Sequence, residues 1–447
     1  MTLNLFWFRR DLRLNDNAGL YHALKSGKPV LPIFIFDTNI LDDLDDRNDA
    51  RVTFLHDTLT ELKAELEALG STLLVLYGKP LDVWQDLTTQ FDIETVFTNH
   101  DYEPYALQRD KAVKELLASK DIDFQTFKDH VIFEHSEVTK DDGLPYTVFT
   151  PYSRKWRTKL ESRLEEHNGQ QISFYLKPYP TDKYYSSFIT HHLSLHTIPT
   201  LESMNFKRST IEIPSKTIAR SVVKNYDKTR DYPALAQGTS RLGIHFRFGT
   251  ISIREKARAA QGLNETYLNE LIWRDFYSMI IQHFPHIGKG QAFRPEYDLI
   301  QWENDETQFQ KWCDGKTGYP LVDAGMRELN ATGYMHNRVR MVVSSFLTKH
   351  LLIDWRWGEA YFAKKLLDYD FASNNGGWQW ASGSGTDAAP YFRIFNPEAQ
   401  LQKFDKDGAY TRRWVPEWLT PQYPRPLVDH KAAREKCLAT YAAALKK

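Results

Sequence analysis

Short apolar runs alternate with amphipathic stretches over the first 130 residues of the chain. Apolar runs of about four to eight residues indicate strands buried in a parallel sheet. The runs are residues 3–8, 30–36, 73–76, 95–98 and 123–127. Between them, apolar residues recur at helical spacing from 54 to 69, before Gly70, and a second helical pattern covers 107–118. The alternation predicts a doubly wound α/β domain with a five-stranded parallel sheet over residues 1–130.

The first predicted strand-to-helix turn reads FRRDLRLNDNAG and lacks the G-x-G-x-x-G pattern. Glycines at that spacing let the backbone approach a dinucleotide pyrophosphate closely. Because they are missing, we do not expect an NAD-dependent dehydrogenase.

The chain changes character after the α/β pattern. Residues 177–214 are rich in Pro, Tyr, His, Ser and Thr without clean periodicity, and we place a long interdomain connector over 131–214. Beyond Tyr226 the pattern is helical almost to the end. This predicts a larger all-α domain over 215–447.

Metal and disulfide chemistry are not indicated. Cys313 and Cys437 are the only cysteines, too few for a disulfide framework or a metal cluster. The connector histidines, His191, His192 and His196, have no Cys or carboxylate at ligand spacing, so a solvated loop is favoured over a metal site. The cysteine content fits a reducing cytoplasm.

The bulk composition is that of a globular protein. Of the 447 residues, 42% are hydrophobic and 26% charged, and no apolar run approaches the ~20 residues of a membrane-spanning helix. A net charge of −1 argues against a protein that coats nucleic acid, but it allows a local basic groove. The aromatic content, 12 Trp, 23 Tyr and 26 Phe, is more informative, although a large α-helical core is the alternative explanation and some of these residues must serve it.

The segment NNGGWQWASGS at 374–384 predicts a wall against a planar ligand. Glycines let backbone come close to a flat group, tryptophans offer π-faces, and buried amides add directional hydrogen bonds. A Gly-rich turn with two core tryptophans remains the alternative.

Two further stretches point to a ligand site. The segment RDYPALAQGTSRLG at 230–243 offers Thr and Ser hydroxyls and backbone amides near the start of a helix, as an anion-binding site does. An ordinary helix N-cap would have the same sequence pattern. On a helix, Glu270, Trp273 and Tyr277 share one face. A core helix would carry Leu or Ile there, whereas a carboxylate with two aromatics suits a base and its imide N–H.

Two helical segments supply polar groups to the same kind of site. In GYMHNRVRM, Asn337 and Met341 share a face; Asn and Arg are common donors to base edges and phosphates. Asp368 and Asp370 precede the Gly-rich segment and can pair with Arg340 or accept from a ligand, unless they are surface carboxylates at a helix end.

In this order, the motifs FRRDLRL, GTSRL, ELIWRDFY, TGYPLVDAGMRELNATGYMHNRVRM, DWRWGEAYF, NNGGWQW and TDAAPYFRIFNP resemble the photolyase/cryptochrome flavoprotein family. Within it the chain is similar to microbial cyclobutane pyrimidine dimer photolyases. The resemblance implies FAD held in the helical domain, active when reduced and anionic. It implies damaged DNA as partner, a monomer without metal or membrane attachment, and a place in the bacterial cytosol.

The resemblance assigns residues to FAD. The cofactor-binding positions it implies are Tyr226, Thr239, Ser240, Arg241, Leu242, Gly243, Tyr267, Arg340, Asp368, Asp370 and Asn374. Position 243 is Gly where relatives often have Ser, which removes one hydroxyl. Asn374 is expected to face flavin N5, where an amide cannot deliver a proton as a carboxylic acid can.

The substrate side is assigned in the same way. The dimer-pocket and DNA-contacting positions implied are Arg230, Glu270, Trp273, Tyr277, Asn337, Arg338, Met341, Trp380 and Gln400. Photolyases of the six-four lesion have histidines at the positions of Asn337 and Met341, so the cyclobutane dimer is favoured. The tryptophan chain implied for photoreduction of the flavin is Trp378, Trp355 and Trp302.

An antenna chromophore is the least specific expectation. The segment HDYEPYALQRD at 100–110 resembles antenna-site sequences, with Glu103 as a contact, and departs from the folate type after that residue. Relatives also line this region with the positions of Trp7, Phe8, Arg9 and Arg10. Methenyltetrahydrofolate, a deazaflavin or FMN are the alternatives.

Two rival functions remain at this stage. A photosensory cryptochrome would want a long signalling tail, and only about thirty residues follow Pro416. A flavin redox enzyme on a small substrate would leave the dimer-pocket residues without a purpose. No Ser-His-Asp order or metal-ligand spacing is visible, which fits chemistry that moves one electron in and back out.

Overall fold

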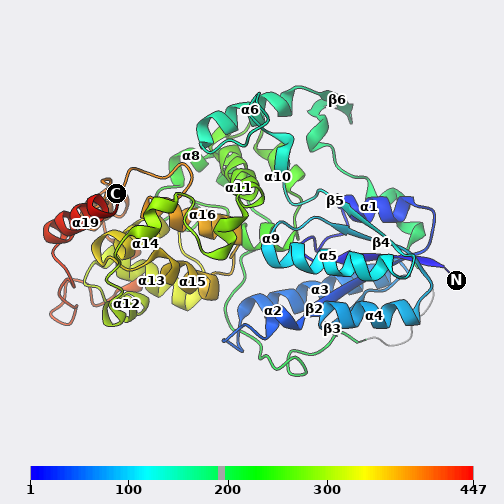
Figure 1. Cartoon of the computed structure of the whole chain (residues 1–447), viewed down its shortest axis with the longest axis horizontal. Helices are drawn as coiled ribbons and strands as arrows, with labels where there is room; N and C mark the ends of the chain where they lie inside the picture. The colour runs from blue at the N-terminus through cyan, green and yellow to red at the C-terminus, as the bar shows by residue number, and fades with distance from the viewer. Residues whose placement is uncertain (1, 190–196, 446–447) are drawn as a thin grey trace. The chain divides into compact units, whose positions relative to one another are not determined.

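The computed structural model describes residues 2–189 and 197–445, and its residues group into two compact units (Figure 1). The first unit comprises 1–134, 157–216 and 242–259, and the second comprises 135–156, 217–241 and 260–447. The predicted connector at 131–214 is therefore shared between the two units, while its histidines at 191, 192 and 196 lie outside the described residues.

The first unit contains the predicted five-stranded parallel sheet. Its strands are β1 (Leu3–Phe8), β2 (Val30–Asp37), β3 (Leu74–Gly78), β4 (Ile93–Asn99) and β5 (Asp123–Phe127). They pair in the order β3-β2-β1-β4-β5, all parallel, with Leu5 opposite Leu31 on one side and Val96 on the other. The sequence predicted the five strands within two residues at each end.

Helices cover both faces of this sheet, as the doubly wound pattern requires. They are α1 (Ala18–Lys25), α2 (Thr38–Leu41), α3 (Ala50–Ala68), α4 (Pro80–Gln90) and α5 (Pro104–Ala118). Alternate residues of β1 point to opposite faces. Phe6 and Phe8 pack with α1 and α3, while Trp7 packs with Trp84 of α4 and Val113 of α5.

The connector segment contains regular structure that the sequence did not predict. It forms η1 (His135–Glu137), α6 (Phe149–Glu161), the antiparallel hairpin β6 (Leu164–His167) and β7 (Gln170–Ser173), and the short helices η2 (Phe174–Leu176) and η3 (Thr181–Ser187). The hairpin turn has Asn168 at φ 50° and Gly169 at φ 76°. An Asn-Gly pair adopts such a turn readily and is the local signal for a hairpin.

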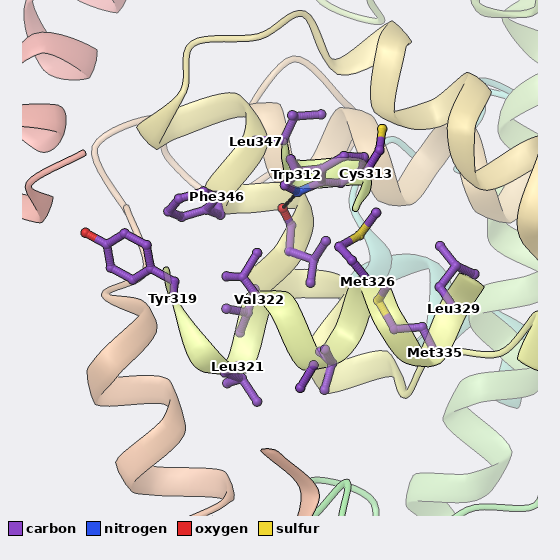
Figure 2. Packing of buried hydrophobic residues seen from close by; sticks show 14 of the residues in the cluster. Trp312, Cys313, Tyr319, Leu321, Val322, Met326, Leu329, Met335, Phe346 and Leu347 are labelled. Atoms are coloured by element: carbon purple, nitrogen blue, oxygen red, sulfur yellow. Dashed lines mark hydrogen bonds between the residues drawn. The ribbon is translucent and has the colours of Figure 1, made fainter. Parts of the chain in front are cut away.

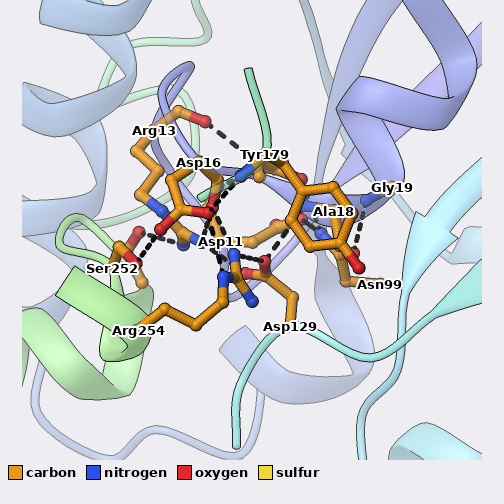
Figure 3. Close-up of polar contacts among 12 residues, drawn as sticks. Asp11, Arg13, Asp16, Ala18, Gly19, Asn99, Asp129, Tyr179, Ser252 and Arg254 are labelled. Carbon is orange, nitrogen blue, oxygen red and sulfur yellow. Dashed lines mark hydrogen bonds and ion pairs between the residues drawn. The ribbon is translucent and has the colours of Figure 1, made fainter. Parts of the chain in front are cut away.

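A buried charge network joins the turn after β1 to α10 (Ile253–Ala260) in the first unit (Figure 3). Arg254 donates to Asp16 Oδ1 at 2.9 Å and to Asp129 Oδ1 at 2.8 Å, and Arg13 donates to Asp129 Oδ2 at 2.7 Å. Burial alone would raise the pKa of Asp129, but the two guanidinium groups hold it well below its usual value. The paired charges fix the loop that follows the first strand.

The second unit is helical. Its remaining elements are α7 (Arg220–Lys224), α8 (Tyr226–Thr229), α11 (Glu265–His283), η4 (Pro285–Lys289), η5 (Pro295–Leu299), α12 (Glu306–Cys313), α13 (Pro320–Thr332), α14 (Asn337–Ser345), the π-helical η6 (Phe346–His350), α15 (Trp355–Lys365), α16 (Phe371–Ser382), α17 (Pro397–Phe404), α18 (Ala409–Trp414) and α19 (His430–Leu445). The helix α9 (Gly243–Phe248) belongs to the first unit. The predicted all-α character beyond Tyr226 is confirmed.

The core of the second unit is centred on α13 and α14 (Figure 2). Trp312 is fully buried there, and its indole N–H donates to the Val343 carbonyl at 3.3 Å. Gly325 lets α13 and α14 approach, because a Cβ at that position would lie 2.4 Å from the Val339 side chain. This core supports the helices that carry the candidate site.

No helix among the described residues is long and apolar enough to cross a membrane. Within residues 2–189 and 197–445, no three or more His, Cys, Asp or Glu side chains are grouped so that they could hold a metal ion.

Candidate functional site

The Gly-rich segment forms α16, which packs against α11, α14 and α15. Asp370 caps the helix by accepting the Ser373 N–H at 3.1 Å, so its carboxylate is fixed at the N-terminus. The two glycines of the segment, Gly376 and Gly377, have different surroundings. A Cβ at Gly376 would lie 2.3 Å from the Tyr277 ring, whereas a Cβ at Gly377 would meet nothing within 4 Å. Gly376 lets two helices touch, and Gly377 borders open space.

Asn374 is buried on α16 and holds a defined orientation. Its Nδ2 donates to the Glu359 carbonyl at 3.1 Å. A carbonyl only accepts, so this contact assigns the amide nitrogen and turns Oδ1 the other way.

The predicted aromatic face exists on α11. The Trp273 ring lies 5.4 Å from that of Tyr277, tilted by 31°, and 5.6 Å from the edge-on ring of Phe276. Both Trp273 and Tyr277 are partly exposed. Burial raises the pKa of Tyr277 above its usual value, so the phenol stays protonated.

Glu270 forms an ion pair with Arg230, from a segment distant in sequence. Burial raises the pKa of Glu270, and Arg230 opposes that rise. The Arg230 guanidinium also lies 5.3 Å from the ring centre of Tyr226, whose edge meets Tyr267 at 5.1 Å. Tyr226 and Tyr267, which were predicted to bind FAD, thus lie next to Arg230 and Glu270, which were predicted to bind DNA.

The predicted anion-binding stretch at 230–243 is divided between the two compact units. Thr239, Ser240 and Arg241 belong to the second unit, whereas Leu242 and Gly243 belong to the first. The Ser240 hydroxyl accepts from the Tyr267 hydroxyl at 3.3 Å.

Tyr334 connects this stretch to α14. Its hydroxyl shares a hydrogen bond of 3.2 Å with Thr239 Oγ1, and the Arg241 guanidinium lies 4.5 Å from its ring centre. Arg241 takes φ 51°, a left-handed conformation that is uncommon outside glycine and asparagine. The polar groups of this stretch are therefore held against the helical core.

Arg340 and Asp368 form the pair that the sequence suggested. Arg340 Nη2 donates to Asp368 Oδ2 at 2.9 Å, and its Nε donates to the Met335 carbonyl at 2.7 Å. Two anchors fix the guanidinium plane and leave Nη1 to other partners.

Asn337 is exposed at the first turn of α14, and Met341 is partly exposed one turn later. Arg338 donates to Asp231 at 2.7 Å and lies 4.3 Å from the ring centre of Phe404 in α17. The buried Oε1 of Gln400, also in α17, has no hydrogen-bond partner among the described residues.

The three tryptophans predicted as an electron path lie in or against one core cluster. Trp378 is 2% exposed and makes ring contacts with Phe362 at 5.0 Å and Trp312 at 6.1 Å. Trp355 opens α15 and is buried, while Trp302 is partly buried against Tyr441 at 6.0 Å. Their role in electron transfer stays a prediction.

Trp380 lies on α16 beside Phe395, with ring centres 6.4 Å apart. It is partly exposed, unlike the buried Trp378 two positions earlier. The two tryptophans of the segment therefore face different surroundings, one in the core and one towards the surface.

The residues predicted for an antenna are engaged with one another in the first unit. Trp7 is 1% exposed, with the guanidinium of Arg9 5.0 Å from its ring centre. Arg9 pairs with Asp110, and Glu103 accepts from Arg10 at 2.9 Å and from Arg247. Phe8 is fully buried in the core.

Several residues at this site escaped the sequence reasoning. They are Phe149, which stacks on Trp273, and Asp231, Tyr334, Glu359 and Asp387. Phe149 lies in the segment interpreted as a connector, and no periodicity ties it to α11. Asp231 follows Arg230 directly in the sequence, and its negative charge was the one signal that could have indicated a partner for an arginine of the site.

The chain is similar to DNA photolyases along most of its length. Residues 4–170 match the family model described as DNA photolyase, and residues 267–419 match the FAD binding domain of DNA photolyase. The deoxyribodipyrimidine photo-lyase of Vibrio cholerae is 36% identical over 99% of this chain and 100% of its own.

Two solved structures have the same fold along the whole chain. The class III photolyase from Agrobacterium tumefaciens superposes with a TM-score of 0.82 at 33% identity, covering 100% of this chain and 98% of its own. The archaeal photolyase from Sulfolobus tokodaii, solved with two FAD molecules, gives 0.81 at 34% identity, covering 99% and 100%.

Proposed function

Since this chain belongs to the DNA photolyase family, we propose that it repairs cyclobutane pyrimidine dimers in DNA in a light-dependent reaction, as a deoxyribodipyrimidine photo-lyase. The observation that carries the proposal is the packing of α16 against both α11 and α14, the helices that carry a carboxylate, two partly exposed aromatics and an exposed asparagine, while Gly377 of α16 borders open space. A small-substrate redox enzyme has no need of such a surface.

FAD fits the residues of the second unit, which contains the FAD-binding domain. We assign the flat ring system of FAD to the space beside Gly377, with the oriented Asn374 amide and the anchored Arg340 as its contacts. Tyr226, Thr239, Ser240, Arg241 and Tyr267 supply hydroxyl and guanidinium donors for the phosphates. We assign Leu242, Gly243, Asp368 and Asp370 to the same cofactor.

Reduced FAD, when bound, supplies one electron to the dimer in the light and receives it back after the ring is split. The protein has to position the reactants and withhold protons. Asn374 serves both needs, because an amide has no acidic proton and its nitrogen is committed to the Glu359 carbonyl. We infer that this keeps the active flavin anionic.

Substrate recognition is assigned to α11 and α14. Trp273 and Tyr277 stack against the flipped pyrimidines, and Glu270 accepts from an imide N–H. Arg230 keeps Glu270 oriented through their ion pair. Asn337, Met341 and Trp380 complete the pocket, and the absence of histidine at 337 and 341 favours the cyclobutane dimer over the six-four lesion.

DNA binding is assigned to Arg230, Arg338 and Gln400. Phosphate contacts position the duplex, and flipping a damaged base pair costs only a few kcal/mol. We further propose that the protein works as a monomer in the cytosol and that Trp378, Trp355 and Trp302 reduce the flavin in light.

The residues predicted for an antenna chromophore are engaged in contacts with one another. Glu103 is held between Arg10 and Arg247, Arg9 is held by Asp110, and Trp7 is buried. Whether methenyltetrahydrofolate, a deazaflavin or FMN is considered, these side chains would first have to leave their partners.

The test is to mix the photoreduced holoenzyme with DNA that carries defined thymine dimers and to count intact dimers after blue or near-UV illumination. We expect loss of dimers in the light and none in the dark, with DNA containing six-four lesions unchanged as a control. Intact dimers in the presence of bound, reduced FAD would overturn the proposal and favour a cryptochrome-type photoreceptor.

A further inference from the structure

Phe149, the first residue of α6, stacks on one face of Trp273. The two ring centres are 3.7 Å apart and the planes differ by 3°. Phe149 is 9% exposed and also meets Phe276 edge-on at 5.9 Å. A near-parallel, closely superposed pair is not the arrangement that aromatic rings favour by themselves, since their quadrupoles prefer offset or edge-to-face contacts. The stack therefore depends on anchors outside the two rings.

Those anchors come from the loop after α16. Thr386 Oγ1 donates to the Thr147 carbonyl at 2.7 Å, two residues before Phe149 in the chain. The loop that follows α16 thus holds the segment that leads into the stacked ring.

The next turns of α6 are fixed to α11 as well. The Trp156 indole N–H donates to Asp275 Oδ2 at 2.9 Å, and the Tyr152 ring lies 5.1 Å from Phe276. All four side chains at these two contacts are buried. The backbone of Phe149 is therefore set with respect to α11 from both ends.

We propose that Phe149 is a positioning residue for substrate recognition: it covers one face of Trp273, fixes the plane of the indole, and leaves the opposite face for the flipped pyrimidine dimer. The inference rests on the proposed function, because it takes the dimer to be the ligand of Trp273. Thr386, which holds the chain just before Phe149, has the same purpose.

The test measures the ratio of Kd values for undamaged and dimer-containing DNA in the holoenzyme. Phe149→Ala is expected to reduce this ratio roughly five- to tenfold, in line with the loss of an aromatic contact, with undamaged DNA bound as before and the FAD spectrum unchanged. Phe149→Tyr keeps the ring and is expected to restore the ratio. An unchanged ratio in Phe149→Ala, or a loss that Tyr fails to restore, would overturn the proposal.

A second pair of variants leaves every ring in place. Thr386→Val removes the hydroxyl that donates to the Thr147 carbonyl and keeps a branched side chain of similar shape, whereas Thr386→Ser retains the donor. We expect a reduced ratio in the Val variant and a normal one in the Ser variant; equal ratios would contradict the anchoring role of this contact. This pair decides the question if Phe149→Ala does not fold.

Trp273→Ala separates this inference from the proposed function. If Trp273→Ala lowers the ratio and the Phe149 and Thr386 variants do not, only the positioning role fails. If Trp273→Ala itself leaves the ratio unchanged, the stacking role in the proposed function fails.

Discussion

Two neighbouring asparagines on α16 have different surroundings because successive helical positions point about 100° apart. Asn375 is 1% exposed, donates to Glu359 Oε1 at 3.2 Å and accepts from Gln379 at 2.9 Å. Asn374 has its nitrogen held and its oxygen turned elsewhere. The Asn375 amide stabilises the helix packing, and the Asn374 amide is the one available to a ligand.

Trp378 is the residue at which the proposed photoreduction path begins. Trp378→Phe keeps an aromatic ring in the core but raises the cost of oxidising it, so we expect light-driven reduction of oxidised flavin to be abolished. Repair by chemically reduced enzyme should persist. The measurement is bleaching of the oxidised flavin absorbance under illumination, followed by a dimer-repair assay.

A matched control is Trp84→Phe, a buried tryptophan of α4 in the other unit. It should leave photoreduction unchanged. Loss of both photoreduction and repair in Trp378→Phe would contradict its assignment to a relay and indicate a structural role.

At the scale of elements, the glycine pair of α16 separates packing from ligand binding. Gly376→Ala would place a Cβ 2.3 Å from the Tyr277 ring, and overpacking of this kind costs about 1–3 kcal/mol. We expect a lower Tm in the flavin-free protein. Gly377→Ala meets open space, and alanine favours a helix over glycine by about 1 kcal/mol.

The Gly377→Ala variant should therefore keep or raise the Tm of the flavin-free protein while binding FAD more weakly. The check is thermal unfolding without flavin alongside FAD titration. Normal FAD affinity in Gly377→Ala would show that the cofactor does not lie beside this position.

Lys349, in the π-helical η6, joins the C-terminal end of α16 to α19. Its ammonium donates to the Ser382 carbonyl at 2.8 Å and lies 3.8 Å from the ring centre of Tyr441. Burial lowers the pKa of Lys349 to about 7, and the nearby Cys437 opposes the shift. Burial raises the pKa of Cys437 to about 11 in turn.

This lysine makes stability depend on pH. Its pKa is about 7 in the folded protein and 10.5 in an ordinary setting, so above pH 7 the unfolded chain binds more protons. The free energy of unfolding should then rise with pH by up to about 1.4 kcal/mol per pH unit. From pH 7 to 9, the Tm of the wild type is expected to rise relative to that of Lys349→Met. Parallel Tm curves would show that Lys349 stays charged when buried.

At the scale of the whole molecule, charge is distributed locally rather than in bulk. The net charge is −1, yet Arg230 and Arg338 lie at the site, each beside a carboxylate. Affinity for DNA must then come from a small number of phosphate contacts, and it should fall as salt rises.

Arg338→Gln tests this contribution. If Arg338 neutralises one phosphate, the slope of log K against log salt should shrink by about 1, equally for damaged and undamaged DNA. Binding titrations over a range of salt concentrations provide the measurement. A loss restricted to damaged DNA would place Arg338 at the lesion instead.

The sequence alone determined the elements whose signal is local. Buried strands and amphipathic helices repeat at fixed spacing, so the five strands, the helical second half and the shared face of Glu270, Trp273 and Tyr277 could all be predicted. The hairpin at 164–173 was missed, although its Asn-Gly turn was a local signal.

Only the tertiary structure decided which distant segments meet. The contacts of Phe149 with Trp273, Arg338 with Asp231 and Asn374 with Glu359 join residues that no period relates. Such pairs follow from how whole helices pack, and their formation depends on many side chains at once. For the same reason the predicted antenna residues, plausible as a sequence motif, are in the fold bound to one another.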